Sequence, residues 1–218
     1  MDESIRLLLT IIEYIGTIAF AISGALVAIE NRMDLLGVIL LGSTTAVGGG
    51  LFRDIIIGRD MPAMFANPSY VIVAVVTTII VFIVMCFLKN LKVIESKAYR
   101  IGYNITDSLG LGVFVVVGTT QTMAAGVTNH FLIIFCAVLT AVGGGMLRDI
   151  MAAHIPAIFR KHIYCVAAII GAVLYYVIIY FSNLYPLAVI STISIVVVIR
   201  YLAFHFKLNL PKVKINVE

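Results

Sequence analysis

Charged residues are scarce in this chain of 218 residues, where Asp, Glu, Lys and Arg together make up 12% of the sequence. A soluble domain carries about twice that share. Hydrophobic residues make up 62% of the sequence, and the mean hydropathy is +1.12. The composition therefore excludes an ordinary soluble domain and predicts a protein embedded in a membrane.

Cysteine is also rare, and its placement excludes a metal centre. Cys86, Cys136 and Cys165 all fall in apolar segments, and the four histidines are scattered without the spacing of metal ligands. The sequence has no nucleophile elbow, and no Walker lysine follows its glycine-rich segments. We therefore expect no enzymatic activity, no metal, no cofactor and no nucleic-acid partner.

Long apolar segments are abundant by contrast. A hydrocarbon core about 30 Å thick needs about 20 apolar residues per helix, and seven segments approach this length. The sequence thus predicts an all-α polytopic membrane protein with seven transmembrane helices. The predicted spans are residues 6–29, 35–57, 69–88, 103–127, 131–152, 162–181 and 184–204.

The basic residues are divided unequally between the two sides of these spans. Twelve of the fifteen lysines and arginines fall toward the side of the carboxyl terminus, in the loop at 89–100, the tail and the adjoining span ends, and the count includes Arg200. Cytoplasmic loops carry an excess of Lys and Arg. We therefore expect the amino terminus outside and the carboxyl terminus in the cytoplasm.

One motif occurs twice, about 95 residues apart. Residues 46–55 read AVGGGLFRDI and residues 141–150 read AVGGGMLRDI, and each copy precedes a Pro-x-x-Phe segment, at Pro62 and at Pro156. An odd number of spans per copy places the copies in opposite orientations, as in many transport proteins. We predict one membrane domain, 1–218, with two inverted three-helix repeats and an added seventh helix. Its parts are repeat one at 6–89, repeat two at 100–182, the extra helix at 184–204 and a cytoplasmic tail at 205–218.

The match between the copies extends upstream of the glycines. At a spacing of 94, four residues of the first copy recur in the second, where Glu13, Gly16, Phe20 and Gly24 match Asp107, Gly110, Phe114 and Gly118.

Each copy contains three consecutive glycines within an apolar span. They are Gly48, Gly49 and Gly50 in the second span, and Gly143, Gly144 and Gly145 in the fifth. Glycine costs roughly 1 kcal/mol per helical position relative to alanine. One interpretation is that both helices are broken or kinked there and line a polar path. The other is that the glycines let helices pack closely. The matching depth of the two triplets favours the first.

Six charged residues lie inside the predicted spans, close to the triplets or in the span before them. They are Arg53, Asp54, Arg148, Asp149, Glu13 and Asp107. Residues at i and i+1 do not face each other on a helix, so we expect each arginine to pair with a group other than its adjacent aspartate. Two roles stay open for the six charged residues. They line or gate a permeation path, or they form salt bridges that hold the helices together.

Hydroxyl groups beside the triplets are further candidates for the lining of a path, although such groups more often bond to their own helix. They are Ser43, Thr44, Thr45 and Thr140. Tyrosines near the span ends, including Tyr70 and Tyr164, are typical of headgroup anchors.

The doubled GGGxxRD motif, the two Pro-x-x-Phe segments and the lone seventh span resemble the prokaryotic branch of the trimeric intracellular cation (TRIC) channels. The resemblance covers roughly residues 6–204. It implies a homotrimer in the inner (plasma) membrane of a prokaryote, with a pore in each protomer built around kinked second and fifth helices. The triplet glycines would be the kink residues, and the Arg-Asp pairs the charged elements beside them.

The same resemblance implies a potassium-preferring channel for monovalent cations. Its partners would be the lipid bilayer, a bound lipid, permeant K⁺ or Na⁺, and further copies of the chain. Some bacterial relatives are described as glycine transporters, so the alternative is a secondary transporter for glycine or another small amino acid.

Overall fold

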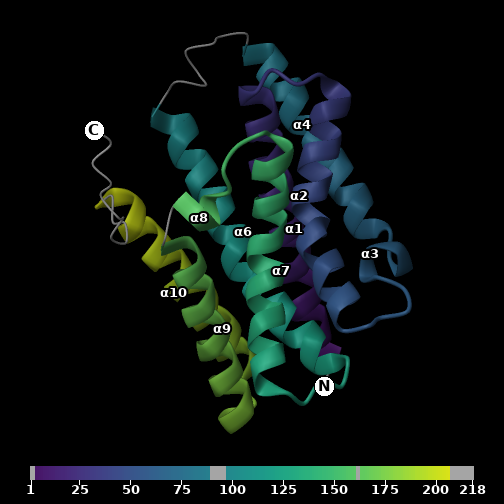
Figure 1. Ribbon diagram of the computed structural model, residues 1–218, viewed down its shortest axis with the longest axis vertical. Coiled ribbons are helices and arrows are strands. Elements are labelled where there is room, and N and C mark those ends of the chain that lie inside the picture. The colour runs from purple at the N-terminus through teal and green to yellow at the C-terminus, as the bar shows by residue number, and fades with distance from the viewer. Residues whose placement is uncertain (1–2, 89–96, 161–162, 207–218) are drawn as a thin grey trace, which may run out of the picture.

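The computed structural model describes residues 3–88, 97–160 and 163–206, and within them it contains seven helices able to span a membrane and no strand (Figure 1). The all-α, seven-span fold is confirmed. The predicted tail beyond residue 206 and the loop at 89–96 lie outside the described residues. The long helices are α1 Glu3–Glu30, α2 Leu35–Ile56, α4 Ser69–Leu88, α6 Lys97–Ala124, α7 His130–Met151, α9 Ile163–Ser182 and α10 Tyr185–His205.

Two short helices follow the helices that carry the motif. They are α3, Ala63–Ala66, after α2 and α8, Ala157–Arg160, after α7. We call the membrane side on which α1 begins the N-side, and the side on which α10 ends the C-side. Because successive spans alternate in direction, α2 ends on the N-side and α7 ends on the C-side.

The helices of the two repeats pack through reciprocal contacts. Gly16 of α1 faces Val113 of α6, and Gly110 of α6 faces Phe20 of α1. The residue numbers rise along one helix as they fall along the other, so α1 and α6 are antiparallel. Phe20 meets Phe114, its counterpart 94 residues later, with ring centroids 5.1 Å apart. Contacts of this kind are expected of two repeats in opposite orientation.

Both glycine triplets lie inside continuous helices, since α2 and α7 run through them. A side chain at Gly49 would lie 2.0 Å from the carbonyl oxygen of Thr140, and one at Gly144 would lie 2.1 Å from that of Thr45. The predicted break is therefore wrong. Gly49 and Gly144 instead have the packing role, because their missing side chains let the backbones of α2 and α7 touch where they cross. A bend of either helix at its triplet stays a prediction.

The seventh span, α10, lies outside the two repeats and packs against α6 and α9 (Figure 1). Small residues bring it close: a side chain at Gly112 of α6 would meet the backbone of Ile193, and one at Gly171 of α9 would meet Val196. This close approach places Arg200, near the end of α10, among buried residues of the second repeat.

Candidate functional site

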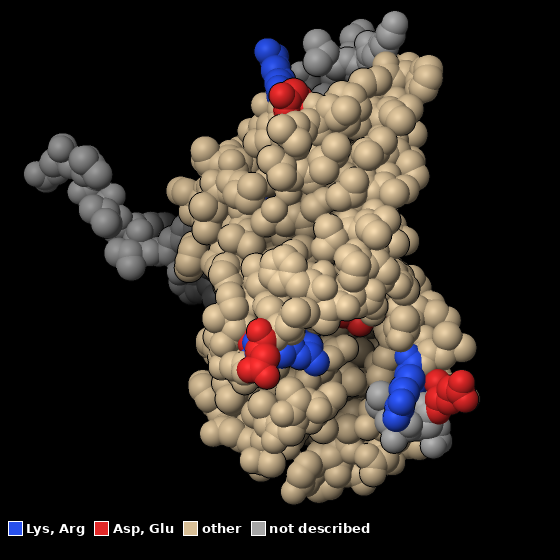
Figure 2. Space-filling model, turned by 90° about the vertical axis from the view of Figure 1, so that its right-hand side faces the viewer, with Lys and Arg blue, Asp and Glu red and all other residues tan. Residues whose placement is uncertain are grey.

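A pocket opens beside the first triplet, and we call it the Glu13 pocket. Its wall reaches Phe114 and Thr140 of the second repeat. Figure 2 looks onto the side that carries α3 and α4, where a hollow with charged side chains around it lies in the lower half. The polar lining of the pocket consists of Glu13, Thr17, Arg53, Asp54, Tyr70 and Thr140.

Hydrogen bonds fix the charged groups of this pocket. The Tyr70 hydroxyl donates to Oε2 of Glu13 at 3.1 Å. Arg53 donates from Nε to Oδ1 of Asp54 at 2.9 Å, and Arg59 lies 3.5 Å from the same oxygen. Glu13 forms no salt bridge within the described part of the chain. Its carboxylate is held by the Tyr70 hydroxyl instead.

Each arginine pairs with its adjacent aspartate, contrary to the prediction. Arg148 Nε donates to Asp149 Oδ1 at 2.9 Å, as Arg53 does to Asp54. The rule that neighbouring residues do not face each other applies to the Cβ positions of a helix. An arginine side chain in the last turn is long enough to reach the carboxylate of the next residue. Each aspartate also accepts a hydrogen bond at 2.7 Å from a backbone N–H of the short helix that follows. Asp54 accepts from Ala63 of α3, and Asp149 accepts from Ala157 of α8. Burial then favours the paired arrangement.

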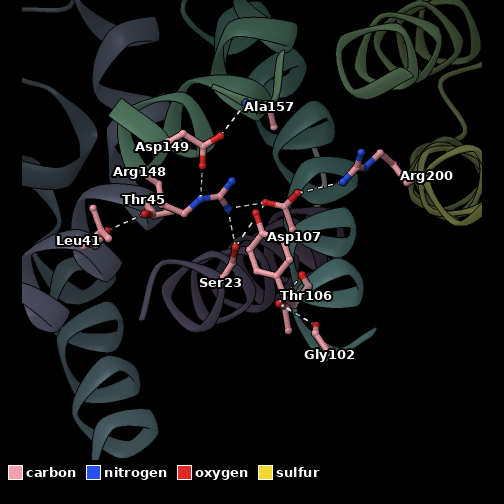
Figure 3. Close-up of polar contacts among 11 residues, drawn as sticks. Ser23, Leu41, Thr45, Gly102, Thr106, Asp107, Arg148, Asp149, Ala157 and Arg200 are labelled. Atoms are coloured by element: carbon pink, nitrogen blue, oxygen red, sulfur yellow. Dashed lines mark hydrogen bonds and ion pairs between the residues drawn. The ribbon is translucent and has the colours of Figure 1, made fainter. Parts of the chain in front are cut away.

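Around the second repeat's acid lies a closed group of charged and polar side chains, which we call the Asp107 cluster (Figure 3). Arg148, with none of its surface exposed, donates from Nη1 to Oδ1 of Asp107 and to the Ser23 hydroxyl, both at 2.6 Å. Arg200 of α10 donates to the other Asp107 oxygen at 3.2 Å. The cluster consists of Ser23, Asp107, Arg148, Asp149, Tyr164 and Arg200.

The cluster holds more hydrogen-bond donors than acceptors. Nη2 of Arg148, Nε of Arg200 and the Tyr164 hydroxyl are buried and find no acceptor among the described residues. The Arg200 guanidinium lies 4.5 Å from the centre of the Tyr164 ring, within the range of a cation–π contact. Two guanidinium groups and two carboxylates balance in charge, so the cluster presents no free charge to a permeating ion.

The structure thus divides the predicted charges between two sites. Glu13, Arg53 and Asp54 line the pocket, whereas the other three belong to the cluster and are Asp107, Arg148 and Asp149. Within the described residues, no group of three or more His, Cys, Asp or Glu side chains is placed to hold a metal ion.

The predicted lining residues are divided in the same way. Gly50 and Thr140 face the Glu13 pocket, and Gly145 faces Tyr164 and Arg148 in the cluster. Thr45 and Thr140 donate to the carbonyls of their own helices at 2.6 Å, as such hydroxyls usually do. The remainder do not line the pocket and are Gly48, Gly49, Gly143, Gly144, Ser43, Thr44 and Thr45.

Among the site residues that the sequence did not point to are Tyr70, Tyr164 and Arg200. Tyr70 and Tyr164 were expected at the lipid headgroups, but Tyr70 bonds Glu13 and Tyr164 is only 2% exposed. Their spacing of 94, the same as that of Glu13 and Asp107, is the signal that could have found them. Arg200 was used only in the count of basic residues that predicts the orientation in the membrane. An ionisable residue inside an apolar span also indicates a buried partner.

Comparison with known proteins agrees with the duplicated architecture. A family model described as a glycine transporter matches residues 10–85 and 104–180. The chain belongs to this family. It is 34% identical to the UPF0126 inner membrane protein YadS of Escherichia coli strain K12, over 92% of this chain and 93% of the relative. It is 37% identical to the UPF0126 membrane protein YvgT of Bacillus subtilis, over 75% and 77% of the two chains.

Solved structures link this family to the TRIC channels. One structure of TRIC cation channels, determined to explain conductance, has a TM-score of 0.82 and 33% identity, over 96% of this chain and 98% of that one. The TRIC orthologue from Rhodobacter sphaeroides has a TM-score of 0.81 and 29% identity, over 92% and 99%. The chain is thus a membrane protein of the TRIC family, and its matched relatives are channels or membrane proteins.

Proposed function

We propose that the chain is a potassium-preferring channel for monovalent cations, with a pore in each protomer of a homotrimer. It lies in the inner membrane of a bacterium, with the N-side outside and the C-side in the cytoplasm. The pore of each protomer runs through the Glu13 pocket toward the crossing of α2 and α7. No cofactor takes part beyond the permeant K⁺ or Na⁺, and lipid surrounds the helices.

The observation that carries this proposal is the Glu13 carboxylate, which faces a pocket, accepts a hydrogen bond from Tyr70 and forms no salt bridge with any described residue. An acid inside a membrane span is costly and usually marks an ion path. Here Asp54 pairs with both Arg53 and Arg59, whereas Glu13 forms no salt bridge with a described residue and faces the pocket. The pocket also reaches Thr140 at the interface of the repeats, where the permeant site of inverted-repeat proteins lies.

The test is electrical recording from the purified full chain in planar bilayers under a KCl gradient. We expect a reversal potential on the cation side and a larger conductance for K⁺ than for Na⁺. Glu13→Gln removes the pocket charge and should lower both the conductance and the cation-over-anion preference. Glu3→Gln removes an equal charge from an exposed site on the same helix and should change neither. Wild-type protein without current, or equal effects of the two variants, would contradict the channel.

A second candidate is a carrier for glycine or another small amino acid. The pocket holds Arg53 and Glu13 together, which suits a molecule with one carboxylate and one ammonium group. Liposomes from the same preparation should then show saturable glycine uptake and counterflow in place of single-channel currents. Arg53→Gln should abolish uptake at unchanged amounts of folded protein.

A further inference from the structure

Arg59 lies just past the end of α2, beside the Glu13 pocket. Its backbone N–H donates to the Asp54 carbonyl at 2.9 Å, after Gly58 has turned the chain with a φ of +68°. Its side chain lies 3.5 Å from Oδ1 of Asp54 and is 34% exposed. The turn thus holds a partly exposed guanidinium group next to an aspartate that lines the pocket.

Arg59 changes the balance of charge around this pocket. Two carboxyl groups, Glu13 and Asp54, line it together with one guanidinium group, Arg53. Arg59 adds a second guanidinium group, so the pocket has no excess of negative charge even when both acids are ionised. Asp54 also accepts from Arg53 at 2.9 Å and from the Ala63 N–H at 2.7 Å. It therefore keeps two closer partners when Arg59 is removed.

The second repeat has the same turn with a histidine in place of this arginine. His154 follows Asp149 by five residues, as Arg59 follows Asp54, and its N–H donates to the Asp149 carbonyl at 2.8 Å. The His154 side chain is exposed and forms no salt bridge within the described part of the chain. The turn therefore forms without an arginine. What Arg59 adds in the first repeat is a permanent positive charge beside the pocket.

We propose that Arg59 sets the electrostatic potential of the Glu13 pocket and limits how strongly the pocket attracts monovalent cations. Its guanidinium is a tethered cation that competes with a permeating cation for the side of Asp54. Charges within a Debye length of a path change the local concentration of ions there. Loss of Arg59 therefore raises cation entry from the N-side. This inference rests on the proposed permeation of cations through each protomer.

The test measures the potential in the pocket without an ion current. Met64 lines the pocket, and Met64→Cys provides a thiol there. The full chain in lipid nanodiscs is treated with a cationic or an anionic methanethiosulfonate, and mass spectrometry gives the labelling rate at position 64. We expect Arg59→Gln to raise the ratio of the cationic to the anionic rate about threefold in about 0.1 M salt, because one nearby positive charge is lost.

Two variants show whether the effect belongs to this charge. Arg59→Lys keeps the charge and should return the ratio close to that of Met64→Cys alone. Arg6→Gln removes an equal charge from the same membrane side, at an exposed residue of α1 that forms no salt bridge within the described residues. It should leave the ratio unchanged, because the Debye length at this salt concentration is about 10 Å.

Arg59→His transfers the residue of the second repeat and makes the charge adjustable. A histidine loses its charge around a pKa of about 6.5. The ratio should therefore be close to that of Met64→Cys alone at about pH 5.5 and raised at about pH 8. Glu13, Asp54 and Tyr70 face the same pocket and Asp60 adjoins the turn, so Met64→Cys alone is measured at both pH values as the reference.

Potassium conductance in planar bilayers then relates this potential to permeation. Arg59→Gln should raise the conductance about twofold in about 0.1 M KCl, since cations enter the pocket more readily. The difference should disappear in about 1 M KCl, where the Debye length falls to about 3 Å.

The outcomes separate this inference from the channel itself. A raised labelling ratio without current in any variant supports the electrostatic role of Arg59 and contradicts the channel. An unchanged ratio in Arg59→Gln overturns the inference whatever the current shows, and so does an equal rise in Arg6→Gln. A raised ratio with current but no gain in conductance also overturns it, because Arg59 would then not limit cation entry. Arg59→His at about pH 8 replaces Arg59→Gln if the latter does not fold.

Discussion

Glu13 and Asp107 occupy equivalent positions in the two repeats, but their surroundings differ. Glu13 faces an open pocket and accepts a hydrogen bond from Tyr70. Asp107 is 1% exposed and lies between Arg148 and Arg200. The equivalent acid, arginine, aspartate and tyrosine thus line a pocket in one half and lie in a buried cluster in the other. A charged residue at equivalent positions of two repeats can therefore have a different function in each, depending on the residues that it contacts.

The largest difference is expected when the buried arginines are replaced by methionine. Arg148→Met leaves Asp107 and Asp149 short of a partner inside the protein and should cost about 3–5 kcal/mol of stability. Arg53→Met leaves Asp54, which is only 1% exposed, with Arg59 and the Ala63 N–H as remaining partners, and should therefore cost less than Arg148→Met. Unfolding by SDS in mixed micelles measures both. Equal losses would mean that the pocket is as closed as the cluster.

The third glycine of each triplet gives the next comparison. A side chain at Gly145 would lie 2.9 Å from the Tyr164 hydroxyl, so Gly145→Ala should destabilise the protein by about 1–3 kcal/mol. At Gly50 the nearest atom is Arg53 Nη2 at 3.8 Å, and Gly50→Ala should gain up to about 1 kcal/mol of helix propensity. The melting temperatures of both variants, measured in the same detergent, show whether each substitution stabilises or destabilises the protein. A loss at Gly50 as large as that at Gly145 would contradict the open pocket.

The two tyrosines should respond in opposite directions to loss of their hydroxyls. Tyr70→Phe removes the hydrogen bond to Glu13 and should cost about 1.5 kcal/mol. Tyr164→Phe removes a buried hydroxyl without an acceptor among the described residues, so stability should stay the same or rise. Chemical unfolding of the two variants side by side decides this. A clear loss in Tyr164→Phe would show that its hydroxyl has a partner.

The smallest effects are expected just past the ends of α2 and α7. Gly58 and Ala153 are equivalent, and their φ angles are +68° and +57°, a conformation that suits glycine. Ala153→Gly should therefore stabilise the protein by roughly 0.5–1 kcal/mol, and Gly58→Ala should destabilise it by a similar amount. Thermal unfolding with the wild type as reference measures the shifts. Two shifts of the same sign would show that these turns are not equivalent.

The sequence predicted the number of spans, the duplication and the charged positions, because apolar length and spacing are local properties. The predicted break at the triplets was wrong, whereas a bend there stays a prediction. Glycine lowers helix propensity, but the gain from touching backbones at Gly49 and Gly144 appears only once two distant helices are placed together. The Arg53–Asp54 pair was missed for a related reason, since side-chain length and burial overrode the spacing rule. Arg200 could not be assigned to Asp107 because nothing in the spacing places α10 beside α6.

The crossing of α2 and α7 has a mechanical consequence. At Gly49 and Gly144 peptide groups touch directly, so the joint contains no rotamer that could absorb movement. A tilt of one helix about this point must displace the other, and the two helices end on opposite faces of the bilayer. The joint can therefore act as a fulcrum through which a rearrangement at one face is transmitted to the other.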